Sequence, residues 1–166
     1  FFSNGQRNIS RNNLSNAYVD YFVGLDFLLA PDTEKSKKLK QRISLLTHEA
    51  LGKDFPKHLE RLDYLYDVRS EYVHNGKAVD PDALIELRNI SRIIVFILIR
   101  LHKRNNGNAN AYLQWLAQID TLVQEIYRGI KPNVAAYSKI GVVRIDTSVL
   151  SKDLSDKQSD FLSTAS

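Results

Sequence analysis

The stretch that decides the fold class of this chain runs from Asp80 to Gly107 and reads DPDALIELRNISRIIVFILIRLHKRNNG. Asp80 is a favoured helix N-cap and Pro81 suits the first helical position, so together they predict a helix start. Every residue from Ile93 to Ile99 is apolar, and Asn106-Gly107 marks the end of the pattern. A helix that is apolar on nearly every side lies at the centre of a bundle or is shared with a partner chain.

Apolar residues at helical spacing predict four more helices around this one. Beyond Ile130 the pattern weakens, with a candidate short strand at 142–145 and a polar terminal segment at 151–166. We therefore predict an all-α, antiparallel bundle of about five helices in residues 1–129, followed by a weakly structured C-terminal extension in 130–166. The expected helices run from Asn12 or Asn13 to Leu29, from Asp32 or Thr33 to Gly52, from Phe55 to His74, from Pro81 to Arg104 and from Asn108 to Arg128.

The composition is that of a globular protein with one domain of ordinary size, since 43% of the 166 residues are hydrophobic and 25% are charged. There is no Cys, which excludes disulfides and thiolate metal sites, and no Met, from which we expect a fragment of a longer protein. No secretion signal is visible, and the longest apolar run is too short to span a bilayer. We expect a cytoplasmic location without membrane contact. The formal net charge of +4 is compatible with a nucleic-acid partner.

The segment from Tyr66 to Gly76, YDVRSEYVHNG, carries the residues most suited to chemistry. Arg69 falls where the helical stripe calls for an apolar core residue, and a buried guanidinium needs a partner. His74 lies near the expected helix end. From the residues alone, a functional Arg69 and an Arg69 in a structural ion pair are equally open.

An Arg and a His together suit phosphodiester chemistry on RNA without a metal or cofactor. A His can take the proton of a 2′-hydroxyl, and an Arg can stabilise the charge that builds on phosphorus. No Gly-rich phosphate loop and no metal-ligand spacing is present. Asp67 and Glu71 are candidates for holding the imidazole. Four basic residues are candidates for contacts with RNA phosphates: Arg61, Lys77, Arg88 and Arg92.

The same Arg–His spacing recurs at Arg42 and His48, in a segment whose amphipathic pattern is ordinary. We interpret that pair as facing the solvent, and we place His58 and His102 on the surface near helix ends. We assign the larger aromatic residues to the core rather than to base stacking: Trp115, Tyr18, Tyr21, Tyr64, Tyr66 and Tyr72.

The segment YDVRSEYVHNG resembles the Arg-Ser-x-x-x-His-Gly signature of HEPN domains, particularly the ApeA-like branch. The run from Tyr21 to Leu29 is similar to that branch's first-helix pattern of Leu-Glu within an apolar stretch, and the likeness covers about residues 12–128. The resemblance implies a helical bundle that forms a homodimer. It also implies a metal-independent ribonuclease of a toxin, abortive-infection or other anti-phage system, regulated by an N-terminal sensor domain or another partner.

By the same resemblance, Arg69 and His74 would be catalytic, with the Arg polarising the phosphate and the His acting as acid and base. The Arg and His of both protomers would line one cleft. Ser70 is usual in the ApeA-like branch, whereas Asp26 is shorter than the family's frequent Glu. Asn75 shifts the Gly of the turn by one position. The supporting residues would be Asp26, Asp67, Ser70, Glu71, Tyr72 and Asn75.

Two other interpretations stay open. The chain could be a HEPN module that binds RNA or a nucleotide without cleaving it. It could also be a helical bundle that serves only dimerisation, with Arg69 as a structural charge. Retention of both Arg69 and His74 favours the nuclease, because inactive HEPN members usually lose one of the two.

Overall fold

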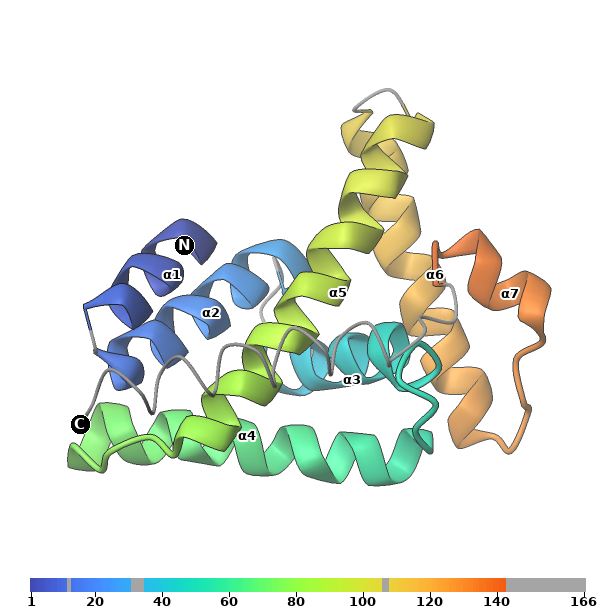
Figure 1. Ribbon diagram of the computed structural model, residues 1–166. Coiled ribbons are helices and arrows are strands. Elements are labelled where there is room, and N and C mark those ends of the chain that lie inside the picture. Colours follow the sequence, from blue (N-terminus) through green and yellow to red (C-terminus); the bar gives the residue numbers. More distant parts are fainter. Residues whose placement is uncertain (12, 31–34, 106–107, 143–166) are drawn as a thin grey trace.

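A computed structural model describes residues 1–11, 13–30, 35–105 and 108–142, and within them the chain is helical with no strand (Figure 1). The predicted all-α class is confirmed. Five helices correspond to the predicted ones, and two short helices, one at each end, were not predicted from the sequence. In order, the helices are α1 (Phe2–Ser10), α2 (Leu14–Leu29), α3 (Lys35–His48), α4 (Phe55–Asn75), α5 (Pro81–Asn105), α6 (Ala109–Tyr127) and α7 (Val134–Lys139).

Side-chain caps explain why several helices start where the sequence predicts. Asn13 accepts a hydrogen bond from the backbone N–H of Asn16 at the start of α2, at 3.3 Å. Asp80 accepts one from the backbone N–H of Asp82 at the start of α5, also at 3.3 Å. Such caps satisfy backbone donors that have no partner inside the helix. The expected start of α3 at residues 32 or 33, the candidate strand beyond residue 142 and the polar segment 151–166 lie outside the described residues.

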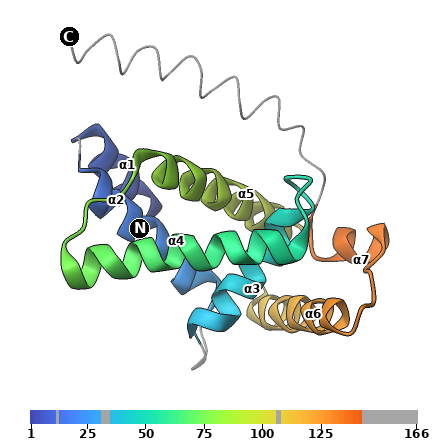
Figure 2. The same cartoon turned by 90° about the horizontal axis from the view of Figure 1, so that it is seen from below.

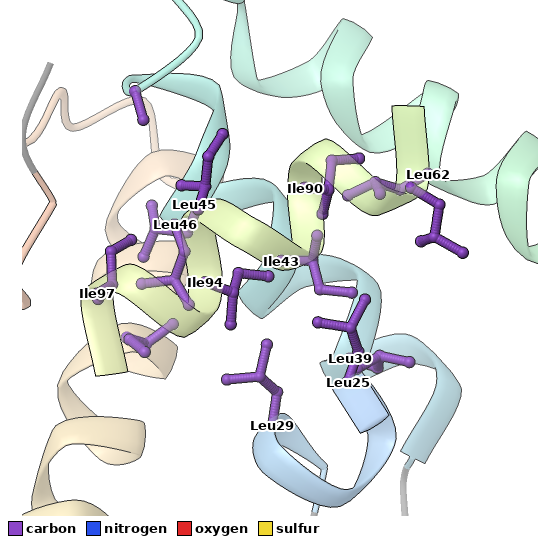
Figure 3. Packing of buried hydrophobic residues seen from close by; sticks show 14 of the residues in the cluster. Leu25, Leu29, Leu39, Ile43, Leu45, Leu46, Leu62, Ile90, Ile94 and Ile97 are labelled. Atoms are coloured by element: carbon purple, nitrogen blue, oxygen red, sulfur yellow. The ribbon is translucent and has the colours of Figure 1, made fainter. Parts of the chain in front are cut away.

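Helices α2, α4, α5 and α6 all pack against α3, and α1 packs against α2. Figure 1 shows α4 along one edge of the molecule, α1 and α2 on one side, and α5 rising from the C-terminal end of α4 toward its hairpin with α6. Figure 2 shows α4 lying across α2 and α3. Buried leucine and isoleucine side chains from α2, α3, α4 and α5 meet in the core (Figure 3): Leu25, Leu29, Leu39, Ile43, Leu45, Leu46, Leu62, Ile90, Ile94 and Ile97.

Helix α5 is central on only one of its sides. Ile94 and Ile97 are fully buried, whereas Phe96 is 48% exposed and Ile99 is 51% exposed. Among the described residues, no helix is both long and apolar enough to cross a membrane. The apolar run of α5 thus serves the core on one side and leaves large apolar side chains accessible on the other.

Arg42 is buried, and the prediction that it faces the solvent is wrong. Only 2% of its surface is exposed. Its Nε and Nη2 atoms lie 2.8 and 2.6 Å from the carboxylate oxygens of Asp120 on α6, and its Nη1 donates to the carbonyl of Leu29 at 2.5 Å. The guanidinium therefore makes a two-pronged ion pair and also satisfies a carbonyl at the end of α2, where no helical partner remains.

His48 is also buried, again contrary to the prediction for this pair. Its Nδ1 faces the carbonyls of Ser44 and Leu45 at 3.0 and 3.1 Å, so this nitrogen carries the proton. Its Nε2 then accepts a hydrogen bond from the hydroxyl of Tyr137 on α7, at 3.1 Å. Together with the indole N–H of Trp115, which donates to the carbonyl of Ile140 at 2.9 Å, this bond fixes α7 against the bundle.

His58 is 1% exposed, so the prediction of a surface position is wrong for this residue as well. The Thr47 hydroxyl donates to the carbonyl of Ile43 at 2.7 Å, so it accepts from His58 Nε2, also at 2.7 Å. The Nδ1 lone pair of His58 is buried without a partner among the described residues. Burial lowers the pKa of His58 to about 4, and the charge of Lys53 acts in the same direction.

Of the aromatic residues assigned to the core, some are buried and others are not. Trp115, Tyr18 and Tyr21 are buried, as predicted, and His102 is exposed, also as predicted. Tyr64 is 45% exposed, which contradicts its assignment to the core. The last two are half-buried at the surface of the bundle: Tyr66 and Tyr72.

Replacement of Arg42 by Ala should lower the free energy of unfolding by about 3 kcal/mol, because the change removes a buried ion pair and leaves the Leu29 carbonyl without its donor. Urea denaturation followed by circular dichroism measures this loss. Arg100→Ala is the control, since Arg100 is exposed on α5 and its loss should change stability by less than about 0.5 kcal/mol. Equal losses in the two variants would contradict the structural role of Arg42.

The stability of the fold should fall as the solution is acidified from pH 6.5 toward pH 4. His58 has a lower pKa when folded than when unfolded, so the unfolded chain binds more protons in this window and its population grows. The contribution of neutral His58 to the free energy of unfolding is complete above about pH 6.5. Up to about 3 kcal/mol of this free energy is lost by pH 4. Urea denaturation at several pH values measures the slope, which should be smaller in His58→Leu. An unchanged slope in that variant would contradict the assignment.

Candidate functional site

The candidate site occupies the C-terminal half of α4, which ends at Asn75, one residue beyond the predicted end at His74. The helix runs to Asn75, and Gly76 has a φ of 67°, the left-handed conformation that favours glycine. The backbone N–H of Gly76 donates to the carbonyl of Tyr72 at 2.9 Å, which closes the last turn. His74 therefore lies in the final turn of α4, where a positive side chain is favoured by the helix dipole.

Two hydrogen bonds attach this end of α4 to the start of α2. The Tyr72 hydroxyl donates to Oδ1 of Asn16 at 2.7 Å. The backbone N–H of Val79, just after the turn, donates to the hydroxyl of Ser15 at 3.1 Å. Tyr72, one of the predicted supporting residues, thus joins α4 to α2.

Arg69 lies between α2 and α4 with its side chain 24% exposed. Its Nη2 is 4.0 Å from Oδ2 of Asp26, and its Nη1 donates to the hydroxyl of Tyr66 at 3.4 Å. Its guanidinium carbon is 5.5 Å from the centroid of the Tyr66 ring. Its Nε is buried and has no hydrogen-bond partner among the described residues. The guanidinium is thus oriented by Asp26 and Tyr66, and its side chain is partly accessible.

His74 is exposed, and no hydrogen bond or ion pair joins its imidazole to another described residue. It follows Arg69 by five residues, which places it about 7.5 Å along the helix axis and about 140° around it. Asp67, Glu71 and Asn75 are exposed as well, and Ser70 is half-buried. One copy of the chain does not bring Arg69 and His74 onto the same face of α4.

The four basic residues predicted to contact RNA have different neighbours. Nε of Arg61 lies 2.8 Å from Glu86, and its guanidinium is 4.5 Å from the Tyr64 ring centroid. Lys77 is exposed just after α4. Burial raises the pKa of Tyr21, and the nearby charges of Arg88 and Arg92 act against that rise. Those two arginines therefore lie near α2, and Arg61 shares the carboxylate of Glu86 with Lys53.

Two residues of the site were missed by the sequence reasoning. Tyr66 was assigned to the core, yet it is half-buried and its ring packs edge-on against Phe22 at 5.8 Å between centroids. Lys40, to which the sequence analysis gave no role, places its Nζ 5.4 Å from the same ring centroid and pairs with Asp63. No one-dimensional signal links Lys40 to Tyr66, because α3 and α4 meet only in the folded bundle.

No group of three or more His, Cys, Asp or Glu side chains in the described residues is arranged to hold a metal ion. No family model matches the sequence, and neither the curated proteins nor the solved structures include a significant match. What the site does must therefore be argued from its own side chains.

Arg69→Ala should lower the free energy of unfolding by no more than about 1 kcal/mol, because its side chain is part-exposed and its contact with Asp26 is long. Arg42→Ala is the matched comparison, since it removes a fully buried arginine from the same bundle. Urea denaturation of the two variants side by side measures the difference. A loss at Arg69 as large as the loss at Arg42 would mean that Arg69 is a structural charge.

Proposed function

We propose that this chain is a metal-independent endoribonuclease domain of the HEPN type, the effector of a cytoplasmic toxin or anti-phage system. The observation that carries the proposal is the state of Arg69. Its guanidinium is oriented by Asp26 and Tyr66, and its side chain is about a quarter exposed although it lies on the packed side of α4. A guanidinium in such a state is suited to binding a phosphate.

The reaction would use Arg69 and His74 without a cofactor. The imidazole of His74 takes the proton of a ribose 2′-hydroxyl, and the 2′-oxygen attacks the adjacent phosphorus. The bond between phosphorus and the 5′-oxygen breaks, and that oxygen receives a proton from the imidazolium. The products are a 2′,3′-cyclic phosphate and a free 5′-hydroxyl. Arg69 stabilises the negative charge on the non-bridging oxygens during the reaction.

The proposal requires a second copy of the chain, because Arg69 and His74 lie on different sides of α4. Val73, next to His74, is 54% exposed although it is apolar. An exposed apolar residue beside a candidate catalytic residue supports an interface at this end of α4. The Arg69 of one protomer and the His74 of its partner would then face a shared cleft.

The purified protein should cleave a mixed pool of tRNA and mRNA in the presence of EDTA, with products ending in 2′,3′-cyclic phosphate. His74→Ala and Arg69→Lys should each reduce the rate at least a hundredfold, in the range expected for the loss of an acid–base group or a charge-stabilising donor. His102→Ala is the matched control, because His102 is also exposed near a helix end and should be dispensable. Gel electrophoresis with end-group analysis measures the products.

Cleavage that survives in His74→Ala, or that disappears equally in His102→Ala, would contradict the assigned roles. One observation favours a second function, the binding of RNA without cleavage. No described side chain orients or polarises His74, and a site that only binds RNA does not need this. If the wild-type protein and His74→Ala are both inert, a gel shift that shows RNA binding lost in Arg69→Ala would favour this non-catalytic module.

Val73→Glu should keep the chain monomeric at concentrations where the wild-type protein dimerises, because it places a charge at the proposed interface. Val134→Glu, on α7, is the control, since Val134 is 84% exposed and lies on another helix. Light scattering after size exclusion gives the mass of each. A wild-type protein that stays monomeric at high concentration would remove the basis for a shared cleft.

A further inference from the structure

The ring of Tyr66 has two cations beside it, one from each of two helices. Nζ of Lys40 on α3 lies 5.4 Å from the ring centroid, and the guanidinium carbon of Arg69 lies 5.5 Å from it, so the two cations are within about 11 Å of each other. Figure 2 shows α4 lying across α3. The packing of the two helices therefore brings Lys40 into the neighbourhood of the proposed phosphate-binding arginine.

Each of the two cations beside the Tyr66 ring has an acidic partner on its other side. Asp63, Tyr66 and Arg69 follow at intervals of three residues and so form one row along α4. Lys40 pairs with Asp63, and Arg69 lies 4.0 Å from Asp26. The contacts therefore run from Asp63 to Lys40, from Lys40 to the Tyr66 ring, and from the ring through Arg69 to Asp26. Lys40 and Arg69 both lie beside the Tyr66 ring, so a chain of phosphates that passes the ring would meet both cations.

The ion pairs of the row are weak enough to yield to a phosphate. The side chain of Asp63 is 51% exposed, and that of Lys40 is 23% exposed. Part-exposed pairs of this kind contribute little to stability, because water competes for both partners. A phosphate accepts charge-assisted hydrogen bonds from lysine and arginine, and its binding is further favoured by the release of counterions.

We propose that Lys40 is a second phosphate contact of the Arg69 site and binds the RNA phosphate next to the one that Arg69 holds. An RNA backbone that crosses Tyr66 brings consecutive phosphates past the two cations. Lys40 then exchanges its ion pair with Asp63 for a contact with phosphate. The inference rests on the proposed function only in taking RNA as the ligand, because it concerns binding and not cleavage.

The test measures the binding of a fluorescently labelled single-stranded RNA by anisotropy over a series of salt concentrations. The full chain carries His74→Ala in every sample, so that the RNA stays intact. Each phosphate contact on a single strand contributes about 0.7 to the slope of log K against log salt concentration. Lys40→Gln should therefore lower the slope by about 0.7 and weaken binding, and Lys57→Gln should leave both unchanged. Lys57 is an exposed lysine near the start of α4.

A second variant predicts the opposite sign. Asp63→Asn removes the carboxylate that competes for Lys40, so it should tighten RNA binding severalfold, and Lys40→Gln should abolish that gain. Equal slopes for Lys40→Gln and Lys57→Gln, no tightening in Asp63→Asn, or no RNA binding at all would overturn the inference. Failure of the proposed nuclease is distinguishable, because a chain that does not cleave RNA can still show both changes in binding.

Discussion

The buried guanidinium of Arg42 is the constraint on which the rest of the bundle depends. It joins three helices, because it lies on α3, pairs with Asp120 of α6 and donates to the carbonyl of Leu29 at the end of α2. These bonds fix the rotation of α3 about its own axis. Lys40 precedes Arg42 by two residues and so points to the opposite side of the helix, where it meets Tyr66 of α4.

Helix periodicity was sufficient to predict the fold class and the start of α5, because a local cap and an apolar stripe determine both. It was insufficient for Arg42 and His58, whose burial depends on partners from other helices, such as Asp120, 78 residues along the chain from Arg42. The short helix α1 was missed because its sequence is polar. Its close approach to α2 depends on Gly5, where an added Cβ would lie 3.1 Å from the ring of Tyr21.

The residues of the candidate site that show a local sequence signal could be predicted, whereas those that depend on contacts between helices could not. Arg69 stood out because it interrupts an apolar stripe, and the structure places it beside Asp26, which the resemblance had selected. Tyr66 and Lys40 could not be linked to it before α3 and α4 were seen to pack. The angular separation of Arg69 and His74 follows from helix geometry alone. In the proposed dimer, the surface that brings them together belongs to a second copy, whose position a single sequence does not contain.

The most direct test of a shared cleft is complementation between two inactive variants. Arg69→Ala and His74→Ala are purified separately, mixed, allowed to exchange protomers and assayed for RNA cleavage with EDTA present. Each variant alone should be inactive, and the mixture should regain activity, because one protomer supplies Arg69 and the other supplies His74. A mixture that stays inactive, although mass measurements show that mixed dimers have formed, would contradict the shared cleft.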